Sequence, residues 1–129
     1  MNRKKERICI TQLLYQHEFN IIEKDNLEQV LAEHKLENSE FARSSIISIL
    51  QNIDKIDNII KSKLNNRKLE TMLPIEKAIL RVSINEFLIQ KSVPVSVSIN
   101  EAVENTKKFS NEDSYKFING ILSAIEKDN

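Results

Sequence analysis

The chain has 129 residues, among them one glycine, two prolines and one cysteine. Folds rich in β-strands need many turns that contain glycine or proline, so this composition favours helices. The single cysteine, Cys9, excludes an internal disulfide and is expected to be a small buried apolar residue. No apolar signal segment follows the basic N-terminus, and no apolar run approaches the roughly 20 residues of a membrane span. We therefore expect a cytoplasmic protein without membrane contact.

The net charge is zero, from 19 basic and 19 acidic residues, but the charges are unevenly distributed. A basic head opens the chain, with the four cations Arg3, Lys4, Lys5 and Arg7. A neutral total normally argues against nucleic-acid binding, yet a local basic cluster can still bind phosphates. Arg3, Lys4 and Arg7 are three and four positions apart, so they share one face if the first helix reaches that far. The alternative is a solvated, frayed terminus, and charge alone does not exclude it.

Apolar residues recur at intervals of three and four, the period of an α-helix. The first helix is predicted over about residues 4–18. A second begins after Asp25, whose spacing to Glu28 is a variant of the capping box. The third starts near Ser39, and the fourth carries Ile56, Ile59, Ile60 and Leu64. Periodicity does not settle whether a break near Asp54 separates the third and fourth segments.

Two prolines and a serine mark the predicted starts of the last three helices. Pro74 suits the first residue of a fifth helix because its missing N–H is not needed there. Pro94 is expected to open a sixth; residues 93–99 also alternate like a strand, but an isolated strand would have no partner. Ser110, with Asp113 three positions later, is expected to cap the final helix. The predicted fold class is all-α, a compact bundle of six to seven helices.

The only glycine, Gly120, lies inside the last predicted helix. Glycine costs about 1 kcal/mol relative to alanine in a helix interior. We expect the close approach of another helix to offset this cost.

The sequence contains no recognisable catalytic apparatus. His17 and His34 are the only histidines, and neither belongs to an HExxH motif or a carboxylate pair. One glycine cannot supply a glycine-rich phosphate-binding loop. We therefore expect a protein that is not an enzyme, with no cofactor and no catalytic or structural metal ion.

The segment from Asp113 to Phe117 is a second candidate for nucleic-acid binding. Tyr115 and Phe117 are two positions apart, so at most one of them faces the core of a helical bundle. An exposed aromatic ring beside Lys116 suits stacking on a base, which contributes about 1–3 kcal/mol per base. The alternative is that Phe117 simply packs in the core.

Three stretches, taken in order, resemble the NusB family of transcription antitermination factors. They are RICITQLLY over residues 7–15, IEKAILRVSINE over 75–86 and VPVSVSINEAVENTKKFSNEDSYKFINGIL over 93–122. The resemblance spans nearly the whole chain and implies one helical domain, residues 1–129, made of two small halves. It implies binding to the boxA element of RNA jointly with NusE, a ribosomal small-subunit protein. Such complexes help RNA polymerase to read through terminators, notably in ribosomal RNA operons.

The resemblance also assigns roles to individual residues. RNA-binding positions fall on Arg3, Lys4, Lys5, Arg7, Tyr15, Asp113, Lys116 and Phe117. Glu76 and Arg81 match positions on the helix that faces NusE. Lysines replace some arginines of the family's basic motif, which keeps the charge but loses the bidentate geometry toward phosphate.

Two alternatives remain open at this stage. The chain could be a detached relative of the helical domain fused to ribosomal RNA cytosine methyltransferases, although the α/β domain and cofactor loop of those enzymes are absent from it. It could also form a homodimer whose interface buries the basic head and competes with RNA.

Overall fold

The computed structural model describes residues 1–129 and contains seven α-helices and no strands. The helices are α1 (Arg3–His17), α2 (Leu27–Glu33), α3 (Glu40–Gln51), α4 (Ile53–Lys61), α5 (Pro74–Ile84), α6 (Val95–Phe109) and α7 (Ser114–Lys127). Short 3-10 turns cover Lys24–Asn26 and Leu69–Thr71, and α5 continues into a π-turn over Asn85–Ile89. The predicted all-α class is therefore confirmed. None of the seven helices has the length and apolarity needed to span a membrane.

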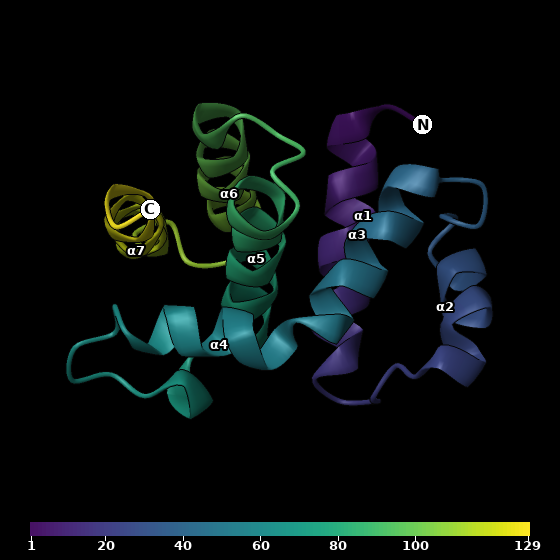
Figure 1. Cartoon of the computed structure of the whole chain (residues 1–129), viewed down its shortest axis with the longest axis horizontal. Helices are drawn as coiled ribbons and strands as arrows, with labels where there is room; N and C mark the ends of the chain where they lie inside the picture. The colour runs from purple at the N-terminus through teal and green to yellow at the C-terminus, as the bar shows by residue number, and fades with distance from the viewer.

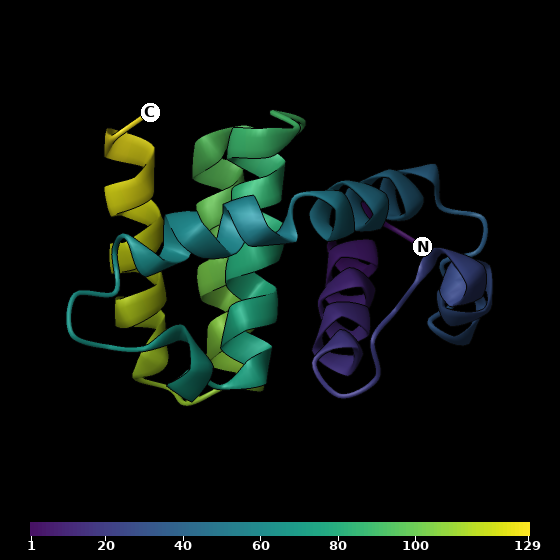
Figure 2. The same cartoon turned by 60° about the horizontal axis from the view of Figure 1, so that its bottom comes forward.

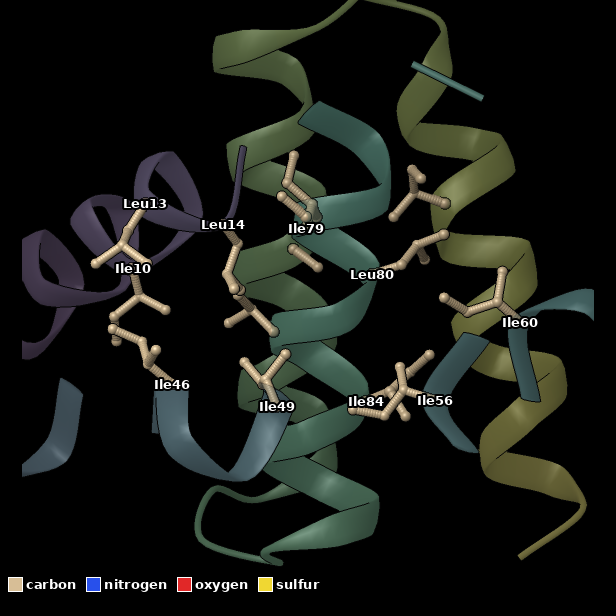
Figure 3. Close-up of a cluster of buried hydrophobic side chains, with 14 of the residues drawn as sticks. Ile10, Leu13, Leu14, Ile46, Ile49, Ile56, Ile60, Ile79, Leu80 and Ile84 are labelled. Atoms are coloured by element: carbon tan, nitrogen blue, oxygen red, sulfur yellow. The ribbon is translucent and has the colours of Figure 1, made fainter. Parts of the chain in front are cut away.

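The helices form two halves that meet at α5. Figures 1 and 2 show α1, α2 and α3 on one side of the molecule and α4, α6 and α7 on the other, with α5 between them. Figure 3 shows Ile10 and Leu14 from α1 and Ile49 from α3 on one side of α5, and Ile56 and Ile60 from α4 on its other side. One continuous cluster of 27 buried apolar residues runs through both halves. Burial of this apolar surface is the main favourable contribution to folding.

Several helix starts follow the local chemistry that the sequence predicted. The Ser39 hydroxyl accepts a hydrogen bond from the N–H of Ala42 at the start of α3, and Pro74 occupies the first turn of α5. Residues 95–109 form a helix after Pro94, so the strand-like alternation there does not produce a strand. A break at Asn52 separates α3 from α4, which settles the open question near Asp54.

Two predicted caps were wrong. Ser110 is not the start of the last helix: it lies in extended backbone at the end of α6, and its hydroxyl donates to the carboxylate of Glu76. Helix α7 begins four residues later, after Asp113. The capping box near the second helix is formed by Glu23 and Asn26, not by Asp25 and Glu28.

The expected packing around Gly120 was also wrong. A Cβ atom built on Gly120 would meet no atom within 4 Å, so no other helix approaches it. Gly120 is exposed on α7, and its φ is not positive. The packing of the chain therefore gives no reason for a glycine at this position.

Candidate nucleic-acid interface

The basic head forms the first two turns of α1. The N–H of Lys5 donates to the side chain of Asn2, which caps the helix and shows that this terminus is helical rather than frayed. The side chains of Arg3, Lys4 and Lys5 are exposed. Arg3 stacks its guanidinium 3.9 Å from the ring centre of Phe41 on α3, which fixes its position. These three cations are therefore presented to solvent from an ordered helix.

Acidic neighbours neutralise this head only weakly. Arg3 pairs with Glu6 at 3.3 Å, and the Lys4 ammonium lies 3.3 Å from a carboxylate oxygen of Glu101 on α6. Lys5 has no ion pair. Exposed pairs of this kind contribute little to stability and exchange readily, so the cations can still meet a phosphate.

Arg7 differs from the other three cations because its side chain is buried. It is 5 % exposed, and its Nε donates to Glu86 at 2.7 Å, with Glu86 itself 1 % exposed. The hydroxyl of Ser98 on α6 donates to the other oxygen of Glu86. Burial raises the pKa of the Glu86 carboxyl, and the charge and hydrogen bond of Arg7 oppose that rise. The predicted shared face is thus divided, because Arg7 points into the junction of the two halves.

Tyr15 lies at the other end of α1 from the basic head. Ten residues separate it from Lys5, about 15 Å along a helix. Tyr15 is 42 % exposed, and its ring centre is 5.1 Å from that of Phe19, which is 62 % exposed. Phe19 was not predicted, because it lies beyond the last turn where helical periodicity applies. The two rings form an exposed aromatic pair at the end of α1.

The start of α7 carries a second group of predicted residues. Asp113 and Lys116 are exposed, and Phe117 is half-buried against the core. The guanidinium of Arg67, in the loop between α4 and α5, stacks 3.9 Å from the ring centre of Phe117. Sequence reasoning missed Arg67 because a loop has no periodicity to indicate which side chains meet. The core-packing interpretation of Phe117 therefore holds in part, and the guanidinium of Arg67 lies over its ring.

Helix α6 connects the basic head with the start of α7. Lys4 contacts Glu101 in the middle of α6, and Lys107 near its end lies 4.5 Å from the ring centre of Tyr115 on α7. The six residues from Glu101 to Lys107 span about 9 Å of helix. Helix α6 therefore contacts the basic head near its middle and the start of α7 near its end.

The two predicted partner-binding residues are buried. Glu76 is 3 % exposed and accepts a hydrogen bond from Ser110. Arg81 is 6 % exposed and donates to both carboxylate oxygens of Asp57 at 2.9 Å each, and also to Glu18. Burial by itself would lower the pKa of Arg81. The hydrogen bonds and charges of Asp57 and Glu18 outweigh this effect and raise the pKa above its ordinary value. Both side chains therefore form hydrogen bonds with other residues of this chain.

The histidines and acidic residues form no group of three or more that could hold a metal ion. His17 accepts a hydrogen bond from the N–H of Ile22, and His34 pairs with Gln16. Both rings are half-buried, and burial lowers the pKa of each. The two histidines therefore act as hydrogen-bonding residues that hold the end of α1 and its following loop.

The fold and surface define a small all-helical protein with a basic N-terminal helix packed on a second helical half. Residues 4–127 match the model of the NusB family. The chain is 37 % identical over 129 residues to the transcription antitermination protein NusB of Bacillus pumilus, covering 99 % of this chain and 97 % of that protein. It is 38 % identical over 141 residues to the protein of the same name from Thermodesulfovibrio yellowstonii, covering 99 % and 93 % of the two chains. The chain belongs to the NusB family.

Solved structures agree with this assignment. The NusB structure from T. maritima superposes with a TM-score of 0.88 at 34 % identity, covering 100 % of this chain and 93 % of that one. A NusB chain from a crystal structure of the antitermination factors NusB and NusE in complex with dsRNA gives a TM-score of 0.85 at 27 % identity. That match covers 98 % of this chain and 97 % of the other.

Proposed function

We propose that this protein is a transcription antitermination factor that binds boxA RNA together with NusE and has no catalytic step of its own. Residues 1–129 act as one domain in this proposal. It works in the bacterial cytoplasm, in a complex through which RNA polymerase reads through terminators, notably in ribosomal RNA operons. The observation that carries the proposal is the ordered, exposed basic head of a NusB-family chain.

The distribution of charge supports the RNA half of the proposal. Arg3, Lys4 and Lys5 are exposed. Their acidic neighbours Glu6 and Glu101 are only partly buried, and they do not hold the cations in buried ion pairs. Contacts between cations and phosphates release counterions, so the resulting affinity falls steeply with salt. Such contacts position an RNA without selecting its sequence. Sequence recognition would then depend on the aromatic and polar residues at the start of α7.

The basic head can be tested by reversing two of its charges. The double variant Lys4→Glu, Lys5→Glu is expected to weaken binding of a boxA oligoribonucleotide at low salt. The slope of log K against log salt should become shallower by about 1.4, because each lost phosphate contact to a single strand contributes about 0.7. The measurement is fluorescence anisotropy at four salt concentrations, with and without NusE.

The matched control reverses two exposed lysines elsewhere on the molecule. Lys24→Glu, Lys55→Glu changes the net charge by the same amount, and neither lysine has an ion pair. This control should keep the wild-type slope. Equal losses in the two double variants would mean that only the total charge matters, and the head would then have no special role.

The exposed aromatic pair is our proposed contact for NusE. Glu76 and Arg81 are buried, whereas Tyr15 and Phe19 expose large rings beside Glu18, the residue through which α1 meets α5. Exposed aromatic groups are enriched at protein interfaces and account for much of their binding energy. This assignment moves Tyr15 from the predicted RNA-binding set to the protein-binding set.

The double variant Tyr15→Ser, Phe19→Ser is expected to raise the Kd for NusE by about tenfold or more. Binding of RNA to the protein alone should be unchanged, because the pair lies about 15 Å along α1 from Lys5. Isothermal titration calorimetry measures the first quantity and anisotropy the second. Val97→Ser removes another exposed apolar side chain, on α6, and is the control. Loss of RNA binding with intact NusE binding would return Tyr15 to the RNA surface.

A further inference from the structure

A basic groove lies between the loop after α4 and the outer face of α7. Figures 1 and 2 show this loop extending from α4 and returning beside the first half of α7. The groove has a volume of about 690 Å³. Its walls include Asn65, Asn66 and Arg67 from the loop and Lys116, Phe117 and Gly120 from α7. Of these residues, only Lys116 and Phe117 belong to the predicted RNA-binding set.

The charges that line this groove favour an anion. Three cations line it, Lys63, Arg67 and Lys116, and no carboxylate does. Lys63 is paired with Asp128, whereas Arg67 and Lys116 have no acidic partner. The neighbouring hollow on the other side of Arg67 is lined by Glu76, Glu112 and Asp113, and so would repel an anion. The positive potential is therefore concentrated on the side of Arg67 that faces Gly120.

Gly120 leaves the backbone of α7 uncovered where it lines the groove. It is the only glycine of the chain, and it lies within the 14-residue helix α7. No atom lies within 4 Å of a Cβ built on it, and its φ is not positive. Neither helix packing nor backbone conformation requires glycine at this position, although it weakens the helix by about 1 kcal/mol relative to alanine. Without a side chain at this position, a ligand in the groove can approach the backbone of α7 closely.

The stacked pair of Arg67 and Phe117 distinguishes a nucleotide from a simple anion. Sequence-specific recognition of RNA mostly uses unpaired bases that stack on aromatic rings or on the plane of an arginine guanidinium. The guanidinium of Arg67 lies over the Phe117 ring, 3.9 Å from its centre, and this contact holds the guanidinium beside the groove. The side-chain amides of Asn65 and Asn66 provide donors and acceptors at the same edge of the groove.

We propose that this groove binds one unpaired nucleotide of single-stranded RNA. Its base stacks on the guanidinium of Arg67, its phosphate meets Lys116, and its ribose lies against the bare backbone of Gly120. This inference rests on the proposed RNA-binding function and extends the RNA contact to the loop of residues 62–67. The loop and Gly120 thereby become determinants of which RNA is bound, in addition to the head that supplies charge.

Gly120→Ala tests the groove because it should act oppositely on stability and on binding. Alanine raises helix propensity and meets no neighbour, so the melting temperature should stay the same or rise. The added methyl group occupies the space of the ribose, so affinity for a boxA oligoribonucleotide should fall about tenfold. Asn119→Ala, at an exposed neighbouring position outside the groove, should leave affinity unchanged. A fall in affinity without a fall in stability cannot come from misfolding.

A second measurement uses the fact that the chain has one glycine. Isotope labelling of glycine nitrogen gives a single backbone amide resonance in the full-length protein, that of Gly120. Addition of the single-stranded oligoribonucleotide should shift this resonance, whereas inorganic phosphate or a blunt duplex of the same sequence should not. An equal shift with inorganic phosphate would overturn the nucleotide and leave only an anion site.

The outcomes separate this inference from the proposed function. If Lys4→Glu, Lys5→Glu weakens RNA binding while Gly120→Ala binds normally and the Gly120 resonance does not move, the groove proposal fails and the proposed function stands. If the wild-type protein binds no RNA, alone or with NusE, both fail.

Discussion

Replacing Arg7 with alanine is expected to lower the free energy of unfolding by about 3–5 kcal/mol, the cost of leaving one member of a buried ion pair alone. Glu86 would remain 1 % exposed without its cationic partner and with only the hydroxyl of Ser98 as a donor. The pair joins α1 to the end of α5, so its loss weakens the contact between the two halves. Urea unfolding followed by circular dichroism measures the change.

Two controls separate the pair from its surroundings. Lys4→Ala removes a cation from the same helix at an exposed position and should have little effect on stability. The double variant Arg7→Met, Glu86→Leu replaces the pair by apolar side chains and should recover most of the lost stability, since such exchanges are often neutral or stabilising. Wild-type stability in Arg7→Ala, combined with loss of RNA binding, would instead place Arg7 in the RNA surface.

The sequence was sufficient to predict the helices because their period depends only on which residues are apolar. It predicted starts correctly where the signal is local, as at Ser39 and Pro74. It failed at Ser110, whose hydroxyl bonds to Glu76, 34 residues away. A hydroxyl can cap a helix or satisfy a distant carboxylate, and only the tertiary arrangement decides between them. The same applies to the break at Asn52, where two helical segments of the same period follow each other.

The sequence was sufficient to identify the charged residues of the candidate site. It did not show which of them are exposed or which side chains contact one another. Arg3 and Arg7 have the same residue type and lie four positions apart, yet one is exposed and the other is buried. The difference arises from Glu86, which lies 79 residues later in the chain. The resemblance to the family found Lys116 and Phe117, but neither periodicity nor charge could show that Arg67 stacks on Phe117. A loop residue's partner depends on how the loop returns to the helices.

Arg81 stabilises a junction of three helices, and its removal is the second change for which we expect a large effect. It bonds both carboxylate oxygens of Asp57 on α4 and the carboxylate of Glu18 at the end of α1, which Lys77 also contacts. Arg81→Ala would leave two partly buried carboxylates without their shared cation, at a cost of about 3–5 kcal/mol. Arg81→Lys should restore only part of this, because a lysine ammonium cannot bond both oxygens of Asp57 in the same way.

The pH dependence of stability in the Arg81 variants distinguishes the loss of this ion pair from a general loss of packing. Burial alone would raise the pKa of Glu18, but Arg81 and Lys77 outweigh it and hold this pKa below the ordinary value of 4.5. A carboxyl with a lowered pKa contributes stability that is fully present above pH 4.5 and is lost as the pH falls through its folded-state pKa. Urea unfolding between pH 7 and pH 3 should therefore show a smaller acid-induced loss in Arg81→Ala than in the wild type. Lys107→Ala, which removes an exposed lysine paired with Glu104, is the control and should keep the wild-type profile. Unchanged stability in Arg81→Ala together with loss of NusE binding would show instead that Arg81 acts at the protein interface.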